Sequence, residues 1–176
     1  MVTDPTDPAC AEAVAIVTGG SCGAGREIAR KLATRGFAVV VVYLCDQAEA
    51  EAAVEEILAA GATAVAVRAD VADELDAERL FTETAAAFGG VDVVVHTAMR
   101  GTSVVNRQAA RQLSHGGAII DVSSAEAITP LLADELRARD ITVNGVAPGL
   151  ECPGAQHDIA DLVVLVDRWL SSPPSA

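Results

Sequence analysis

Short apolar runs recur along the chain, and each is followed by a turn and then by a stretch whose apolar residues return every three or four positions. The runs are rich in Val, Ile and Ala, and they stay apolar at consecutive positions. That pattern is typical of strands buried on both faces of a parallel sheet. It predicts strands at Ala13–Thr18, Phe37–Tyr43, Thr63–Arg68, Val91–His96, Gly117–Val122 and Ile141–Val146.

The stretches between these runs predict amphipathic helices. Their apolar positions are Ile28, Ala29, Leu32 and Ala33 in the first helix, Ala53, Val54, Ile57 and Leu58 in the second, and Leu75, Leu80, Phe81 and Phe88 in the third. Gly61 and Gly89 stand where left-handed caps are expected to end the second and third helices. Three further helices are expected over Ser103–Leu113, Pro130–Arg139 and Asp158–Leu170.

Strands and helices that alternate in this way predict an α/β fold, a doubly wound parallel sheet with helices on both faces. We expect a Rossmann fold of about six strands in the order 3-2-1-4-5-6. With 176 residues the chain is long enough for one domain, which we place at residues 13–170. Residues 1–12 are expected to form a flexible tail, and residues 171–176 a disordered one.

Composition narrows the possible partners. The formal charge of −13 disfavours nucleic acid and anionic membrane surfaces. No two of the four cysteines have C-x-x-C spacing and the three histidines are scattered, so no metal site is expected. The chain start lacks a signal pattern, and the longest apolar run, Phe37–Leu44, is too short to cross a bilayer. These features predict a cytoplasmic protein with reduced thiols.

The stretch TGGSCGAG joins the first predicted strand to the first predicted helix. Gly19 allows a sharp turn off the strand, Gly23 allows the backbone to approach a pyrophosphate, and Gly25 allows close packing of helix on sheet. The amides at the start of the helix would then face the phosphates. This context predicts dinucleotide binding, and the alternative is a tight turn without a ligand.

At these residues the sequence resembles the short-chain dehydrogenase/reductase family, and the resemblance extends over most of the chain. RADV resembles the family's adenine-contacting segment, and VDVVVHTA resembles the strand that ends in Asn-Asn-Ala-Gly. GGAIIDVSS resembles the strand with the catalytic Ser, and ITVNGVAPG resembles the strand beside the nicotinamide. The resemblance implies Ser124 as a catalytic residue. It implies cofactor contacts from Gly19, Ser21, Cys22, Gly23, Gly25, Tyr43, Asp70, Val71, His96, Ala98, Pro148 and Gly149.

The sequence departs from the family where the chemistry takes place. The family uses a Tyr-x-x-x-Lys pair on the helix after the Ser strand, in which Tyr is the proton donor and Lys lowers its pKa. The single Tyr here is Tyr43 and the single Lys is Lys31, and neither lies in that helix. The segments on both sides of Ser124 and the one after Gly149 are short, so weak or lost catalysis is expected.

Several alternatives stay open. The chain is a weakened hydride-transfer oxidoreductase for a small carbonyl substrate, a nucleotide-binding pseudoenzyme that serves as a regulatory or interaction module, or a decayed gene product that folds poorly. His96 is either a replacement acid or a polar residue bonded to backbone at the end of a strand. Cys22 and Cys45 are either a redox gate or two free thiols.

The cofactor assignment rests on the end of the second strand. An acidic residue there would bond the ribose hydroxyls and select NAD, but Tyr43 takes that place. NADP is therefore slightly favoured over NAD.

The short helices Ser103–Leu113 and Pro130–Arg139 offer little interface, so a monomer or homodimer is expected, with Asp158–Leu170 covering the last strand.

Overall fold

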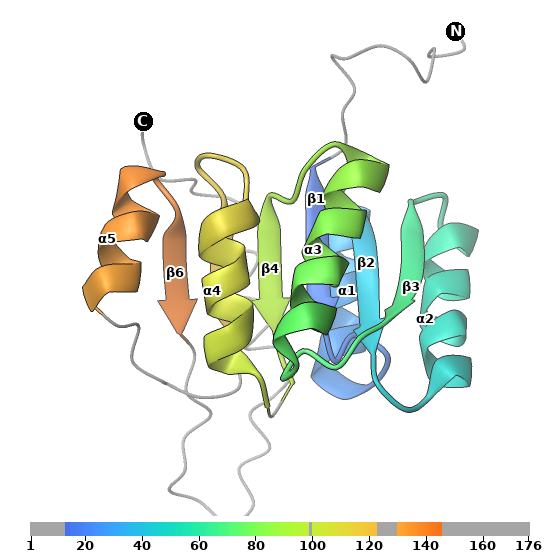
Figure 1. Ribbon diagram of the computed structural model, residues 1–176. Helices are drawn as coiled ribbons and strands as arrows, with labels where there is room; N and C mark the ends of the chain where they lie inside the picture. The colour runs from blue at the N-terminus through green and yellow to red at the C-terminus, as the bar shows by residue number, and fades with distance from the viewer. Residues whose placement is uncertain (1–12, 99, 123–129, 146–176) are drawn as a thin grey trace, which may run out of the picture.

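The computed structural model describes residues 13–98, 100–122 and 130–145, which form one parallel sheet flanked by helices (Figure 1). The strands are β1 (Val14–Thr18), β2 (Ala38–Tyr43), β3 (Ala64–Arg68), β4 (Val93–His96), β5 (Ala118–Asp121) and β6 (Thr142–Gly145). The helices are α1 (Gly23–Thr34), α2 (Gln47–Ala59), α3 (Glu74–Phe88), α4 (Thr102–Gln112) and α5 (Pro130–Ala138). Each predicted strand is confirmed with small shifts at its ends.

The sheet has the order β3-β2-β1-β4-β5-β6 and every pairing is parallel. This is the predicted doubly wound topology. Because the order reverses beside β1, the loops after β1 and β4 diverge at the carboxyl edge of the sheet and leave a crevice there. The first backbone amide of β1 is bonded to the residue before β4, since Val14 N–H donates to Asp92 Oδ2 over 2.8 Å.

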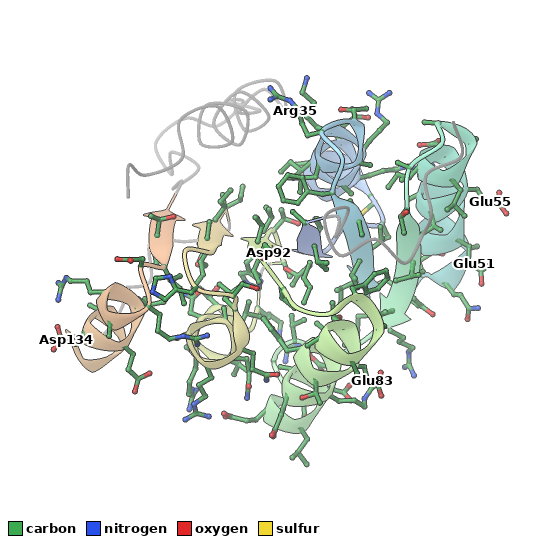
Figure 2. All side chains as sticks on the ribbon, turned by 90° about the horizontal axis from the view of Figure 1, so that it is seen from above. Arg35, Glu51, Glu55, Glu83, Asp92 and Asp134 are labelled. Atoms are coloured by element: carbon green, nitrogen blue, oxygen red, sulfur yellow. The ribbon has the colours of Figure 1, made fainter. Side chains whose placement is uncertain are left out.

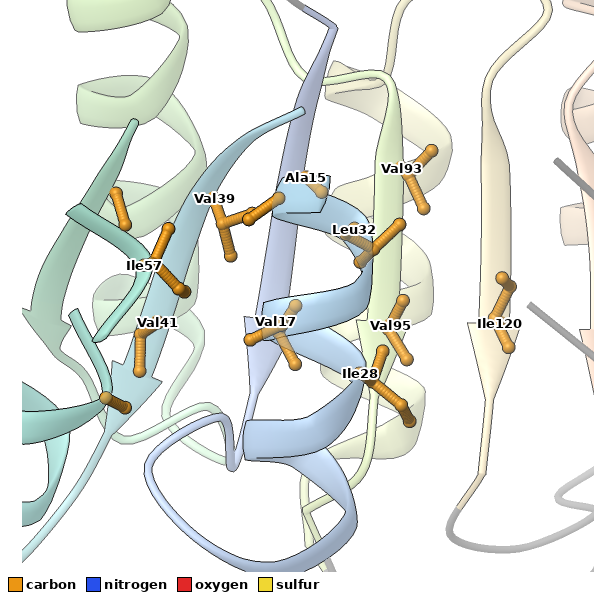
Figure 3. Close-up of a cluster of buried hydrophobic side chains, with 14 of the residues drawn as sticks. Ala15, Val17, Ile28, Leu32, Val39, Val41, Ile57, Val93, Val95 and Ile120 are labelled. Atoms are coloured by element: carbon orange, nitrogen blue, oxygen red, sulfur yellow. The ribbon is translucent and has the colours of Figure 1, made fainter. Parts of the chain in front are cut away.

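Two apolar layers hold the helices on the sheet. On one face, α1 and α2 pack on alternate strand residues, with Ile28 and Leu32 over Val17 and Val95, as Figure 3 shows. On the other face, α3, α4 and α5 pack on the intervening residues, with Phe81 and Leu113 fully buried. Since both faces are covered, all residues of β1, β4 and β5 are buried, as their uninterrupted apolar pattern predicted.

The view along the sheet shows the two helical layers on either side of the strands (Figure 2). Arg35, Glu51, Glu83 and Asp134 lie on the outside, whereas Asp92 lies among the strands. The four labelled helix and helix-end residues are thus exposed, in keeping with the amphipathic pattern.

The helix ends follow local chemistry. Asp46 and Asp73 cap α2 and α3 by accepting backbone N–H groups of the first turn. Gly61 and Gly89 have φ values of +82° and +90°, as expected for the glycines that follow these helices. Two details of the helix pattern are wrong: Leu58, placed on the apolar face of α2, is 51% exposed, and Leu75, placed among the apolar positions of α3, is 75% exposed. Leu58 faces outward because α2 covers the edge strand β3, beyond which no further strand of the described chain lies. Leu75 lies in the first turn of α3.

The predicted tails and the predicted helix Asp158–Leu170 lie outside the described residues.

Candidate nucleotide site

A cavity of about 210 Å³ opens at the carboxyl ends of the strands. Its lining comes from the segments that follow β1, β2, β3 and β4: Gly19, Ser21, Val42, Tyr43, Leu44, Ala69, Asp70, Val71, Ala98 and Arg100. Drug-sized ligands are usually enclosed by about 300–1,000 Å³. A cavity of this size therefore suits one end of a dinucleotide better than the whole molecule.

The loop between β1 and α1 is held on two sides. Gly20 N–H donates to the Val42 carbonyl over 3.2 Å, which ties the loop to β2. The Thr97 hydroxyl donates to the Thr18 carbonyl over 2.6 Å, which ties it to the end of β4. A loop fixed in this way presents its backbone amides in a set direction, as binding of an anion requires.

Glycine stands at three positions of this loop for three different physical reasons. Gly19 has φ +66°, and a Cβ there would lie 2.8 Å from Thr97 Oγ1. A Cβ on Gly25 would lie 2.1 Å from the Gly19 carbonyl oxygen, so only glycine lets α1 pack on the loop. Gly23 has φ +52°, and a Cβ there would meet nothing within 4 Å. The space beside Gly23 at the start of α1 is thus open to a phosphate, which is the fit that a dinucleotide needs.

Asp70 is oriented by its own turn. Its Oδ1 accepts the Ala72 N–H over 3.0 Å, and its backbone N–H donates to Asp76 Oδ2 over 3.1 Å. This backbone hydrogen bond, followed by the hydrogen bond from Arg79, lowers the pKa of Asp76. Asp70 Oδ2 makes no hydrogen bond within the described chain, which leaves an acceptor for an exocyclic amine at the cavity.

His96 is fully buried and does not line the cavity. Its Nδ1 lies 2.8 Å from the Thr18 hydroxyl, which itself accepts the Thr97 N–H over 3.3 Å. Either the hydroxyl donates to Nδ1 or Nδ1–H donates to the hydroxyl, and in both tautomers Nε2 has no partner within the described residues. Burial lowers the pKa of His96, opposed in part by the charge of Asp121.

His96 is thus a neutral residue whose ring is hydrogen-bonded to a side chain. The sequence had suggested a bond to backbone as one of its two roles, so the partner differs from that expectation. The pairing arises because Thr18 and His96 are register partners on adjacent strands. Nothing in this arrangement directs the imidazole toward a substrate.

Of the predicted cofactor residues, the structure brings together six around the cavity: Gly19, Ser21, Tyr43, Asp70, Val71 and Ala98. Gly23 and Gly25 lie in the first turn of α1 and Cys22 at its N-cap. Cys22 and Cys45 are both exposed free thiols. Ser124, Pro148 and Gly149 lie outside the described residues.

Sequence reasoning missed four lining residues: Val42, Leu44, Ala69 and Arg100. The first three adjoin predicted contacts, so their position next to strand ends was an available signal. Arg100 had none, because it lies in the loop before α4, whose course depends on the close packing of Gly101 on the Val71 carbonyl.

Within the part of the chain that the structure describes, no helix is both long and apolar enough to cross a membrane. Nor do His, Cys, Asp and Glu side chains gather there in a group that could hold a metal ion.

Comparison with known proteins agrees with this geometry. The family model for short chain dehydrogenases matches residues 13–114. An uncharacterized oxidoreductase of Methylorubrum extorquens is 35% identical, over 82% of this chain and 75% of its own. A 3-oxoacyl-[acyl-carrier-protein] reductase of Staphylococcus aureus is 33% identical, over 77% of this chain and 73% of its own.

Among solved structures, a short chain dehydrogenase of Burkholderia cenocepacia in complex with NADP is similar. It has a TM-score of 0.72 and 28% identity, with 89% of each chain covered. A family match over more than half of the sequence, relatives above 30% identity and the shared topology lead to one conclusion. The chain belongs to the short-chain dehydrogenase/reductase family of NAD(P)-binding oxidoreductases.

Proposed function

We propose that this protein binds NADP, or less readily NAD, through the adenosine half of the cofactor, and that its hydride-transfer activity is weak or lost. The bound nicotinamide would supply or accept the hydride. The observation that carries the proposal is a contrast: the adenosine-side cavity holds six predicted contacts, while the chain's Tyr and Lys lie away from the place of the family's catalytic pair.

The positions of these two residues support the proposal. Tyr43 ends β2 and lines the cavity, where it stands in place of an acidic ribose contact and so brings no carboxylate that would repel a 2′-phosphate. Lys31 lies in the last turn of α1. Neither can donate a proton to a carbonyl in the way the family's pair does. Loss of one positioned acid lowers a rate by roughly 10²–10⁴-fold.

Each remaining group would have a defined task in binding. The loop Gly19–Gly25 would receive the pyrophosphate on the N-terminal amides of α1. Asp70 Oδ2 would accept the adenine amine, and Val71 would pack on the ring. Ala98 would border the ribose. Ser124, Pro148 and Gly149 are proposed for the nicotinamide side from the resemblance alone.

Calorimetric titration with NADPH, NADP, NADH and NAD tests the proposal, combined with a turnover assay on a panel of small carbonyl compounds. We expect micromolar binding of the 2′-phosphorylated cofactors and little or no turnover. Efficient turnover would show that another residue replaces the missing pair. No binding of any of the four would contradict nucleotide binding itself.

A second candidate is a nucleotide-binding pseudoenzyme that serves as a regulatory or interaction module. Two observations favour it: the adenosine-side cavity is formed, and the sequence has no Tyr-x-x-x-Lys pair to donate a proton. Binding without any turnover, together with a change in a partner's affinity on nucleotide addition, would select it over the weakened oxidoreductase.

Residues 13–170 are proposed to form a single domain that exists as a monomer or homodimer. Helix α4 has only 11 residues, and the sequence predicts a helix of about three turns over Pro130–Arg139, so the two offer little area for the roughly 1,200 Å² that lasting interfaces bury. Light scattering after size exclusion decides this. A stable tetramer at micromolar concentration would contradict it.

A further inference from the structure

We propose that Arg68 binds the 2′-phosphate of NADP and thereby sets the cofactor preference of this chain. The inference rests on the proposed function, because it concerns the ribose end of the same cavity. It is carried by the position, the hydrogen bonding and the available charge of this one guanidinium.

Arg68 does not line the cavity itself but directly precedes Ala69 and Asp70, which do. It is the last residue of β3 and the register partner of Tyr43, the last residue of β2. Its Nε donates to the Leu44 carbonyl oxygen over 3.1 Å, so the guanidinium is held beside two residues that line the cavity. In dinucleotide-binding folds the residue that ends the second strand faces the ribose 2′ position. The Arg68 guanidinium is therefore beside the place where a 2′-phosphate would lie.

The guanidinium retains donors for a ligand. An arginine carries five N–H donors, and the hydrogen bond to Leu44 uses only the one on Nε. Within the described residues, the Nη groups of Arg68 enter no hydrogen bond or ion pair. The Asp76 carboxylate, whose pKa Arg68 helps to lower, already accepts from the Asp70 N–H and from Arg79.

Other arginines near this end of the sheet are occupied. Arg79 pairs with Asp76 and Glu83 and donates to the Arg68 carbonyl over 3.1 Å. Arg26, on α1, pairs with Glu49 and Glu56. These contacts neutralise their charges, whereas Arg68 keeps two parallel donors that match the geometry of a phosphate.

The backbone and the side chain of Arg68 are both fixed. Arg79 holds its carbonyl from α3, and the Nε hydrogen bond holds its guanidinium at the loop after β2. A side chain ordered before binding loses less conformational entropy when the ligand arrives. This favours binding by Arg68 over binding by an unrestrained surface arginine.

Arg100 is the competing cation, since it also lines the cavity. It lies in the loop after β4, however, and β4 is separated from β2 by β1. Arg68 is on the strand next to β2. Leu44, which lines the cavity directly after β2, carries no charge.

The test compares adenosine 2′,5′-bisphosphate with adenosine 5′-monophosphate by calorimetry, on wild type, Arg68→Gln and Arg68→Lys. Arg137→Gln is the matched control, because Arg137 is an exposed arginine on α5 that pairs only with Asp134 in the described chain. We expect Arg68→Gln to weaken the bisphosphate by roughly ten- to hundredfold and the monophosphate by less than about twofold. Arg68→Lys should lose less, and Arg137→Gln should lose nothing.

If Arg68→Gln lowers the affinity for both nucleotides equally, Arg68 only supports the loop. If it lowers neither affinity, another group binds the 2′-phosphate. Either result overturns the inference. Wild type that binds the monophosphate as tightly as the bisphosphate also overturns it, while the proposed function stands. Wild type that binds neither nucleotide would overturn the proposed function and the inference together. Melting temperatures of the variants confirm that each is folded.

Discussion

The half of the sheet formed by β1, β2 and β3 is longer in nearly every element than the half formed by β4, β5 and β6. Its strands have 5, 6 and 5 residues, against 4 in β4 and 4 in β5. Helices α1, α2 and α3 have 12, 13 and 15 residues, whereas α4 has 11. The long half supplies most of the cavity lining, and the short half is where the family places its proton donor.

The two halves are nevertheless packed alike. The residues of β4 and β5 are as completely buried as those of β1. Ile119 and Leu113 in the short half are fully buried, as are Ile16 and Leu32 in the long half. The short half therefore has a closed core of its own around β4 and β5. The difference between the halves concerns the site and not the packing.

The largest effect is expected from Gly25→Val. Its Cβ would lie 2.1 Å from the Gly19 carbonyl oxygen, so α1 must move off the loop. We expect destabilisation of about 3 kcal/mol or more and complete loss of nucleotide binding. Chemical denaturation and calorimetry measure the two effects. Gly90→Ala, at the opposite end of the sheet, is the control and should lower the free energy of unfolding by less than about 1 kcal/mol. A Gly25→Val variant that is as stable as wild type and still binds the nucleotide would contradict the close packing of α1 on the loop.

Gly23→Val separates binding from folding. A side chain there meets no protein atom, so only the positive φ opposes it, at about 1–2 kcal/mol. It would instead fill the space proposed for the pyrophosphate. Dinucleotide affinity should fall by at least about a hundredfold, a change of about 2.7 kcal/mol. If calorimetry finds the affinity unchanged, the loop is only a turn between strand and helix.

His96 makes stability depend on pH. Its folded pKa lies below the unfolded value of 6.5, so the unfolded chain binds the proton more readily. Stability from the neutral ring is complete above the unfolded pKa and is lost as pH falls from there toward the folded pKa. When the pH falls from about 7.5 to about 5.5, the free energy of unfolding of His96→Asn should decrease by up to about 1.4 kcal/mol less than that of wild type. Urea denaturation at the two pH values measures this difference. Identical pH dependence of the two proteins would contradict the buried neutral ring.

The smallest difference is expected between Ile16→Val and Ile119→Val, a matched pair from β1 and β5. Both side chains are fully buried in the same apolar layer. Each change should cost about 0.5–1.5 kcal/mol, and the two costs should agree within about 0.5 kcal/mol. A much smaller cost for Ile119→Val, measured by denaturation, would show that the short half is loosely packed.

The sequence predicted the strands well because strands buried on both faces carry an apolar pattern that depends little on their neighbours. It failed for Leu58, because the pattern of α2 does not reveal that the helix covers a sheet edge. For the site, Gly19, Asp70 and Val71 could be found because they adjoin strand ends. Arg100 and the guanidinium of Arg68 could not, because their positions depend on how separate loops meet across the sheet.

The most direct test of the contrast between the two halves compares NADPH with its two fragments by calorimetry. These fragments are adenosine 2′,5′-bisphosphate and reduced nicotinamide mononucleotide. If the adenosine half carries the binding, the bisphosphate should reach within about tenfold of the NADPH affinity, and the mononucleotide should show no binding at millimolar concentration. NADPH binding about a thousandfold tighter than the bisphosphate, with measurable binding of the mononucleotide, would contradict this account.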